Sequence, residues 1–521
     1  MARKSWLGPL VLALSLAGFG VAWAVTNPIG AAPDEPAHYI KALAVGQGDW
    51  LGSKLAPGEQ PVFAEPVRDN LATIRDVPQL TRRVTIPARL EPDKAGCTAF
   101  TPAPATCLAA DASVNSRWGK GSTAYTYLGT YQPFVYVLPG FAMQLAATPL
   151  QAFIIGRLAF GTIALLLIGV GALLCFGIAP RRAMLVGVLA SLSPMVLFIS
   201  FTVSASSSEI AGGVAASGAV LHLAYGGPRR RLAWLTLALG GAFLACSRPL
   251  GPAWVAIFAL TMWSLMGWRG TWLTLQRNLR WSIPTAATVI AACAASLGWQ
   301  FAFQPRPVLS LHTMAQGFIH SFASVPGILL QEVGNFGWLD TKQVAPSYFI
   351  WGGLVLALVT LAMFLGSNRE RWTLGWLGAL NLLLTPLVYP IVAAPNGVGV
   401  QGRWLLPVAV SIPMFAGVIV ARRTSTTRVA NLVILGAVGA IALVQLLAIY
   451  QNARRYAVGS SGDMLFFRQS QWVAPGGWTV WLVLALLSSA GLVAAAILMG
   501  WDGRAGCEPP HPARSAVTGF S

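Results

Sequence analysis

Two adjacent carboxylates, Asp34 and Glu35, stand between two prolines in the stretch NPIGAAPDEPAHY, directly after a long apolar run. A carboxylate at the mouth of a membrane span could act as a general base that takes a proton from an attacking hydroxyl group. His38 follows Asp34 by one helical turn, so a helix starting at Pro36 would gather these side chains at its N-terminus. The alternative is structural, because carboxylates are favoured at that position and PDEP could simply cap the helix. The sequence alone leaves both interpretations open.

Three arginines could supply the complementary charge. Arg248 in CSRPLGP, Arg306 in QPRP and Arg403 in GVGVQGRWLLP each stand at the expected outer end of an apolar run. The planar guanidinium group suits a phosphate, so these residues are candidates for binding an anionic ligand. The commoner fate of an interfacial arginine is to reach the lipid headgroups, and that alternative stays open for each of them.

A second hydrophilic stretch, 304–347, adds a helix and a further acid. Apolar residues recur at helical spacing from Leu311 to Phe322, which predicts an amphipathic helix lying on the membrane surface. The turn GNFGWLD follows, and its Asp340 could face the same site. The short SASSSEI stretch contains Glu209, to which the sequence assigns no role.

The composition places all these residues in a polytopic membrane protein. Apolar residues make up 55% of the 521 residues and charged residues only 10%, which would not cover a soluble globule with polar surface. The formal net charge of +18 comes mainly from short arginine clusters between apolar runs, so membrane topology explains it and no nucleic-acid partner is expected. The pattern predicts an all-α fold with about 12 transmembrane helices, at 6–25, 150–178, 183–202, 209–225, 232–247, 252–267, 282–303, 348–366, 372–393, 404–421, 429–449 and 478–500.

The arginine clusters also orient the chain, because positive residues are retained on the cytoplasmic side. They occupy alternate connections, at 181–182, 229–231, 269–280, 369–371 and 422–428. Both termini are therefore expected in the cytoplasm. The predicted organisation is a first, uncleaved span at 1–25, a long extracytoplasmic loop at 26–147 with a partly embedded helix from 131, a multi-spanning domain at 148–500 with the outer loop 304–347, and a disordered cytoplasmic tail at 501–521.

The cysteines agree with this orientation. Cys97 and Cys107 are the two cysteines of the large outer segment, where a disulfide can persist, and we expect them to pair. The sequence contains no CxxC or HExxH spacing, so no metal site is predicted from a motif. One acidic pair cannot distinguish a divalent cation site from a metal-free base, and the cofactor stays open.

Four stretches resemble blocks of a bacterial membrane family of unknown function whose members carry a PDEPAH-type motif. They are PDEPAHY at Pro33 to Tyr39, YQPFVYVLPG at Tyr131 to Gly140, NFGWLD at Asn335 to Asp340 and QGRWLLP at Gln401 to Pro407. The last departs from the usual pattern, because Trp404 stands where the family has tyrosine. The family is similar to the GT-C glycosyltransferases, and the resemblance covers the chain from about residue 8 to residue 500.

The resemblance implies a GT-C-like fold and an enzyme of the bacterial inner membrane. Such an enzyme would move a sugar from a polyprenyl-phosphate donor in the lipid bilayer to an envelope glycan or glycolipid on the outer face, with inversion, in cell-wall biogenesis. The resemblance implies that Asp34 is the base and that Glu35 orients the acceptor or helps to bind a divalent cation. It implies positioning roles for His38, Tyr39 and Asp340. Phosphate binding is implied for Arg403 first, and then for Arg248 and Arg306.

Other function classes remain as alternatives. A transporter or lipid-linked glycan flippase also fits twelve spans with both ends inside, but carriers usually hold ionisable residues within the membrane and show two similar halves. Here Arg157 and His222 are the nearest such residues, and the long outer segment has no counterpart in the second half. A non-catalytic partner subunit for envelope assembly stays open. A glycosidase is disfavoured, because it needs two carboxylates about 5–10 Å apart across a sugar.

Overall fold

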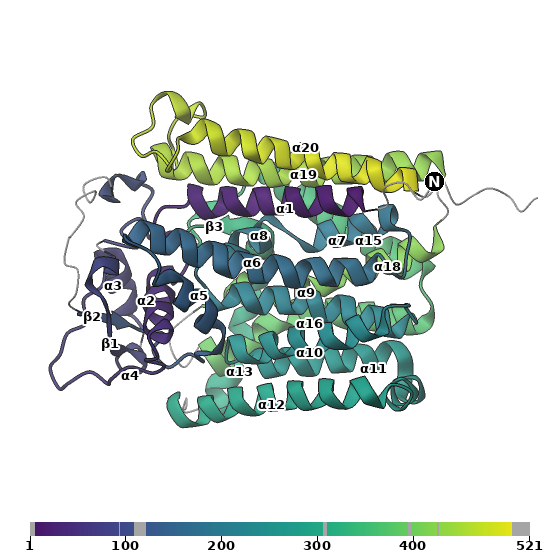
Figure 1. Ribbon diagram of the computed structural model, residues 1–521, viewed down its shortest axis with the longest axis horizontal. Helices are drawn as coiled ribbons and strands as arrows, with labels where there is room; N and C mark the ends of the chain where they lie inside the picture. Colours follow the sequence, from purple (N-terminus) through teal and green to yellow (C-terminus); the bar gives the residue numbers. More distant parts are fainter. Residues whose placement is uncertain are drawn as a thin grey trace, which may run out of the picture.

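The computed structural model describes residues 6–74, 76–92, 94–108, 121–305, 310–393, 399–424 and 427–502. These residues form a bundle of long helices with a smaller unit of short helices and one hairpin at one end (Figure 1). Nine helices of the described residues are long and apolar enough to cross a membrane. They are α1 (Leu7–Thr26), α6 (Pro149–Cys175), α11 (Gly251–Gln276), α12 (Leu279–Phe303), α15 (Ala345–Leu365), α16 (Asn368–Val388) with η5 (Tyr389–Ala393), α17 (Gly402–Ala409) with α18 (Ser411–Arg423), α19 (Arg428–Val458) and α20 (Trp478–Asp502).

A further apolar pair of helices is bent. α7 (Arg181–Ser191) and α8 (Pro194–Ser200) meet at 70° and make a tenth span if they are counted as one. Leu192 leaves the helical conformation, and Ser193 then starts α8 by accepting a hydrogen bond from the Val196 amide at 3.3 Å. Proline at the first position of α8 completes this restart, since its fixed φ suits a helix N-terminus.

Two more long helices, α9 (Ala205–Ala224) and α10 (Arg230–Ser247), are less apolar and are not among these candidates. α9 contains ASSSE and is buried almost throughout by α6 and α10, so lipid does not require it to be apolar. Each predicted span therefore coincides with a helix or with two consecutive helices, and the all-α polytopic class is confirmed. The prediction of twelve spans exceeds the nine or ten that length and composition support in the described chain. A GT-C-like arrangement stays a prediction.

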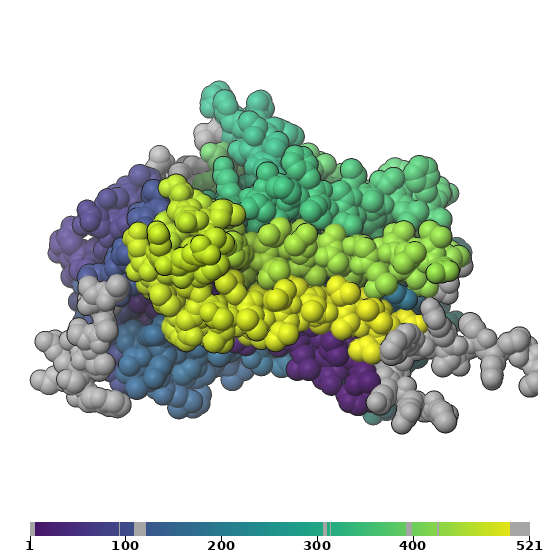
Figure 2. Space-filling view, turned by 90° about the horizontal axis from the view of Figure 1, so that it is seen from above, coloured from purple at the N-terminus to yellow at the C-terminus, as the bar shows by residue number. Residues whose placement is uncertain are grey.

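The outward faces of the bundle carry large apolar side chains. Ile290, Leu356 and Phe364 on α12 and α15 are exposed. In a soluble protein these faces would be unfavourable in water, whereas a bilayer covers them. Seen from above, α20 and α19 run along the bundle above α1, which packs closely against α20 (Figure 2). The structure is thus that of a multi-pass membrane protein.

The unit at one end of the bundle is built from the segment after α1. It contains α2 (Glu35–Gly46), α3 (Glu65–Leu71), α4 (Val77–Leu80), β1 (Arg82–Pro87), η1 (Ala88–Leu90), η2 (Ala105–Leu108), β2 (Gly121–Thr126), η3 (Phe134–Tyr136) and α5 (Val137–Met143). β1 and β2 pair antiparallel, with Arg82 opposite Thr126. The sequence analysis did not predict this sheet. α2 and α5 approach so closely that a Cβ on Gly140 would lie 2.0 Å from the Ala42 carbonyl oxygen, which explains the glycine there.

The segment between α12 and α15 contacts this unit through Trp338. It forms α13 (Leu311–Ser321), η4 (Phe322–Ser324), α14 (Val325–Gly334) and the short pair β3 (Asn335–Phe336) and β4 (Thr341–Lys342). The predicted helix from Leu311 is present, with Leu311 and Ile319 exposed. Trp338 donates its indole N–H to the Gly30 carbonyl at 2.9 Å, which fastens the β3–β4 turn to the α1–α2 connection.

The start of α1 and the end of α20 lie at one end of the bundle, opposite α2 and the β1–β2 hairpin (Figure 1). Arginines of the predicted cytoplasmic clusters meet there, since Arg422 donates to the Ile178 carbonyl at 2.7 Å and Arg423 pairs with Glu370. The cytoplasmic assignment of this end stays a prediction, and the predicted tail beyond residue 502 lies outside the described residues.

Candidate functional site

Asp34 sits in the turn between α1 and α2 with a left-handed backbone, φ 61°. Few residues other than glycine adopt this conformation, so the surrounding structure must hold it. Asp34 occupies the position before the helix, yet its side chain makes no capping hydrogen bond. It accepts a hydrogen bond from the Tyr127 hydroxyl at 2.9 Å and another from Arg403. The capping alternative therefore does not describe Asp34, whose carboxylate lines a cavity instead.

Glu35 points the opposite way, into the core, although it is the next residue. Its side chain is fully buried, and its two oxygens accept hydrogen bonds from Arg157 at 2.8 and 2.7 Å. Arg157 also donates to the carbonyls of Ala24, Asn27 and Pro28 at the end of α1. This buried ion pair joins α6 to the α1–α2 turn and holds the turn that carries Asp34. Glu35 is not among the residues that line the cavity.

Arg403, at the start of α17, has all its nitrogens engaged. It donates to the Asp34 carboxylate, to the Pro33 carbonyl at 2.8 Å and to the Gln401 side chain at 2.6 Å. Its side chain is 2% exposed, whereas the Asp34 side chain is 28% exposed. Arg403 thus orients the Asp34 carboxylate and favours its ionised form. Arg403 does not itself line the cavity, so it is not placed to contact a ligand there.

Arg248 is the arginine that reaches the cavity. It follows α10, donates to the Ser206 hydroxyl at 3.2 Å, and its guanidinium lies 5.2 Å from the centre of the Trp404 ring. This cation–π contact holds the guanidinium beside the Trp404 ring, and the side chain remains 12% exposed. Trp404 is therefore in contact with the cationic group of the site.

The other predicted site residues lie elsewhere. The His38 ring is buried and its Nδ1 is 2.6 Å from the Tyr136 hydroxyl, while the Tyr39 hydroxyl donates to the Leu90 carbonyl at 2.8 Å. Asp340 lies 3.6 Å from Arg455 and accepts a hydrogen bond from Thr341. None of these three lines the cavity. Arg306 lies outside the described residues.

The predicted disulfide is present. The sulfurs of Cys97 and Cys107 are bonded, and their Cα atoms are 6.4 Å apart. Arg455 donates to the carbonyls of Thr98, Thr101 and Ala103 inside the disulfide loop. The loop is thereby tied to α19, and its Phe100 forms part of the cavity wall.

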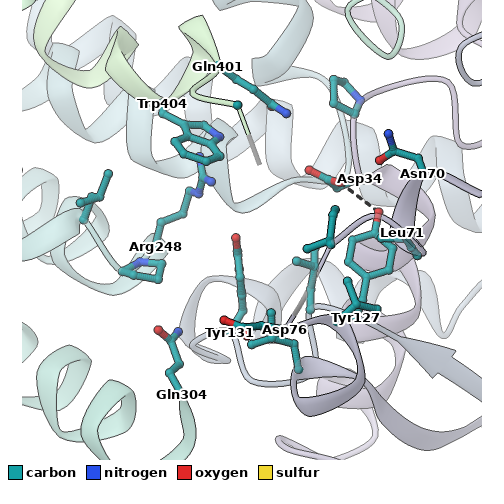
Figure 3. A pocket seen from close by; sticks show the side chains of 18 of the residues that line it. Asp34, Asn70, Leu71, Asp76, Tyr127, Tyr131, Arg248, Gln304, Gln401 and Trp404 are labelled. Carbon is teal, nitrogen blue, oxygen red and sulfur yellow. Dashed lines mark hydrogen bonds between the residues drawn. The ribbon is translucent and has the colours of Figure 1, made fainter. Parts of the chain in front are cut away.

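The cavity has a volume of about 540 Å³ and lies between the bundle and the unit at its end that carries α2 to α5. That size falls in the range of small-molecule sites. In Figure 3, Asp34 and Tyr127 lie on one side, Arg248 against Trp404 on the other, and Tyr131 and Asp76 below. Several apolar side chains complete the wall: Leu71, Ile74, Val77, Leu80, Leu128, Leu250, Leu339 and Ile391.

Electrostatics keep Asp34 ionised. Burial would raise the pKa of Asp34, but the charge and hydrogen bond of Arg403, with the Tyr127 hydrogen bond, hold it below its usual value. Burial raises the pKa of Tyr127 well above its usual value, so its hydroxyl remains a donor to Asp34. Burial likewise lowers the pKa of His38 to about 3, so the His38 ring is neutral near pH 7. The chemistry available is an ionised carboxylate and a separate guanidinium facing one cavity.

A divalent cation does not fit this arrangement. Asp34 is bound to Arg403 and Tyr127, and Glu35 is bound to Arg157. Within the described parts of the chain, no group of three His, Cys, Asp or Glu side chains could hold a metal ion. We therefore assign no step to a cation.

Sequence reasoning missed three residues of this region. Tyr127 carries no motif, and Glu209, which lines the cavity, was left without a role. Arg157 could have been found, because an ionisable residue within a span normally pairs with another charge. Its partner could not be named from sequence, since Glu35 is 122 residues away.

Comparison with protein families supports the membrane-protein class. Residues 17–412, most of the chain, match the family described as Predicted membrane protein (DUF2142), and the chain belongs to that family. The four stretches that carry the resemblance lie within the matched residues. No curated protein and no solved structure matches the chain.

Proposed function

We propose that this member of the family is an integral membrane glycosyltransferase of the bacterial inner membrane. It would move a sugar from a polyprenyl-phosphate donor to an envelope glycan or glycolipid on the extracytoplasmic face. The observation that carries the proposal is the placement of the ionised Asp34 carboxylate in the same cavity as the Arg248 guanidinium. A transfer from a lipid phosphate needs both groups, one for the acceptor proton and one for the phosphate.

The proposed step is a direct displacement. The acceptor oxygen bonds to the anomeric carbon while the bond from that carbon to the phosphate oxygen breaks, so the configuration inverts. Asp34 takes the proton of the acceptor hydroxyl, and the electron pair leaves with the polyprenyl phosphate. Because Arg403 holds the pKa of Asp34 low, the proton moves late, when the forming bond has made the hydroxyl acidic.

Of the two candidate arginines that the structure describes, Arg248 and Arg403, Arg248 is better placed to bind the phosphate. Its guanidinium faces the cavity, whereas Arg403 is committed to Asp34, Pro33 and Gln401. A guanidinium in a site shielded from water stabilises the charge that develops on the leaving phosphate. This reverses the order predicted from the sequence, where Arg403 came first. Arg403 instead serves as the residue that positions the base.

The position of the cavity suits a lipid donor. Gln300, Gln304 and Pro305 at the end of α12 line it, and α12 is among the most exposed helices of the bundle. Ile391, in η5 directly after α16, also lines the cavity and is exposed. A prenyl chain in the bilayer could therefore lie against these helices while its phosphate enters the cavity.

The test is the transfer reaction of the Asp34→Asn variant. Purified protein would be given polyprenyl-phosphate sugars and an envelope glycan fraction, and the glycosylated product would be measured. Asp34→Asn should keep the fold and lipid binding but lose at least about 100-fold in transfer rate, the ordinary contribution of a general base. The matched control is Asp69→Asn, which removes an exposed carboxylate of α3 that pairs with the exposed Arg68.

Two results would count against the proposal. Transfer at the normal rate by Asp34→Asn would exclude a base at this position. Movement of a lipid-linked glycan across a vesicle membrane by the wild type, with no product formed, would favour the flippase alternative.

A further inference from the structure

Glu209 is a buried carboxylate on the cavity wall that the proposed reaction does not use. It lies in the second turn of α9 and is 1% exposed. One of its oxygens, Oε1, accepts a hydrogen bond from the indole N–H of Trp254 at 2.8 Å. Trp254 is itself 1% exposed, so the carboxylate is held in a single orientation.

The second oxygen, Oε2, is incompletely satisfied. No described residue donates a hydrogen bond to it, and its nearest charged partner is an Arg248 nitrogen at 3.9 Å. A buried carboxylate oxygen without a donor is costly, because it has lost water and gained nothing in return. Glu209 lines the cavity, so a small shift of its side chain, whose Oε2 is shielded from solvent in the structure, opens that oxygen to a donor from a bound ligand.

The side chains of the surrounding cavity wall indicate which kind of hydrogen-bond donor the ligand supplies. A carboxylate accepts hydrogen bonds and repels a phosphate, so Glu209 suits hydroxyl groups and not the anionic part of a donor. Gln300 and Gln304 line the same cavity, and amide side chains both donate to and accept from hydroxyls. Arg248, within 3.9 Å of Glu209, places the anion-binding group next to this hydroxyl-binding group.

We infer that Glu209 is the sugar-binding residue of the donor site. Its Oε2 accepts hydrogen bonds from hydroxyls of the transferred sugar, while the adjacent Arg248 holds the phosphate to which that sugar is attached. Trp254 positions the carboxylate. The inference rests on the proposed function, because it assigns the lipid-phosphate sugar to this cavity, and it adds the residue that distinguishes the sugar-bearing lipid from the bare lipid phosphate.

The test compares affinities for two kinds of lipid. Full-length protein in detergent is titrated with a short polyprenyl monophosphate and with matched polyprenyl-phosphate glycosides that carry a hexopyranose or a pentofuranose. The wild type should bind one glycoside roughly tenfold or more tightly than the bare phosphate, as expected for a hydrogen bond to a charged group. Glu209→Gln should lose this preference and bind the bare phosphate as tightly as the wild type or more tightly. Arg248→Gln should weaken both.

Two further variants keep the result interpretable. Glu65→Gln removes an exposed carboxylate of α3 and should leave the preference intact. Trp254→Phe keeps an aromatic ring but removes the orienting N–H, and it should reduce the preference several-fold even if Glu209→Gln does not fold.

The remaining outcomes distinguish a failure of the sugar-binding role of Glu209 from a failure of the proposed function. A glycoside preference that survives in Glu209→Gln, or a wild type that binds the phosphate but prefers none of the glycosides, overturns the sugar-binding role and leaves the proposed function intact. A wild type that binds neither kind of lipid overturns the proposed function itself.

Discussion

Replacing Glu35 with glutamine separates a structural role for this residue from the catalytic role that the sequence predicted. The side chains of Glu35 and Arg157 are 0% and 1% exposed, and two hydrogen bonds of 2.8 and 2.7 Å join them. Glutamine keeps the shape and one acceptor oxygen but removes the charge, so a buried guanidinium is left uncompensated. Breaking one side of a buried ion pair costs roughly 3–5 kcal/mol, and we expect a loss of stability of that size.

The measurement is unfolding of the purified protein in detergent, followed by tryptophan fluorescence and by thermal melting. Arg157→Met and the double variant with Glu35→Gln complete a double-mutant cycle. Because the double variant has no unpaired buried charge, it should be more stable than the sum of the single effects predicts. Glu65→Gln, at an exposed site, should change the stability by less than about 0.5 kcal/mol.

The opposite pattern would refute this reasoning. If Glu35→Gln had the stability of the wild type and the double variant showed no coupling, the buried pair would not hold the α1–α2 turn. If that stable variant also lost sugar transfer, the catalytic role predicted from the sequence would be restored.

The remaining predictions concern the outer unit and the pH dependence. Replacing both Cys97 and Cys107 by serine should lower stability by about 3 kcal/mol, from the loop closed over a separation of 10 residues, and reduced wild type should melt like the variant. Because the pKa of His38 falls to about 3 in the folded protein, the unfolded chain binds a proton first as the pH falls below about 6.5, and stability should drop by up to about 1.4 kcal/mol per pH unit. His38→Gln should flatten that dependence between pH 7.5 and pH 5 in melting experiments, and an unchanged slope would count against it. Arg403→Gln should raise the pKa of Asp34, so the acid limb of the kcat/KM profile should move to higher pH; an unmoved limb would show that Arg403 does not set the charge of Asp34.

Local features of the chain were predictable from the sequence. The helices follow from apolar runs, and the bond between Cys97 and Cys107 follows from two cysteines close together in one outer segment. From the sequence, Asp34 could either face a functional site or cap a helix. The backbone conformation at Asp34 decided between these two interpretations. A left-handed residue at Asp34 turns neighbouring carboxylates in opposite directions, and no pattern of proline and acid predicts that turn.

Long-range contacts were not predictable. Tyr127 and Arg403, which hold Asp34, are 93 and 369 residues away in the chain. The order of the two arginines also depended on tertiary contacts, because both stand at span ends and only the structure shows that Arg403 is already engaged. The β1–β2 hairpin was missed because its strands are short and separated by a long connection.

In the proposed function, a lipid phosphate enters the cavity that Asp34 and Arg248 share. The most direct test of this proposal is photolabelling with a polyprenyl phosphate that carries a photoreactive group in its first isoprene unit, followed by peptide mapping. We expect labelled peptides from the cavity wall, around Leu250, Gln304 and Trp404, with labelling lost in Arg248→Gln and kept in Arg468→Gln, which removes an exposed arginine outside the cavity. Labels confined to the lipid-facing surfaces of α15 and α19, unchanged in Arg248→Gln, would contradict it.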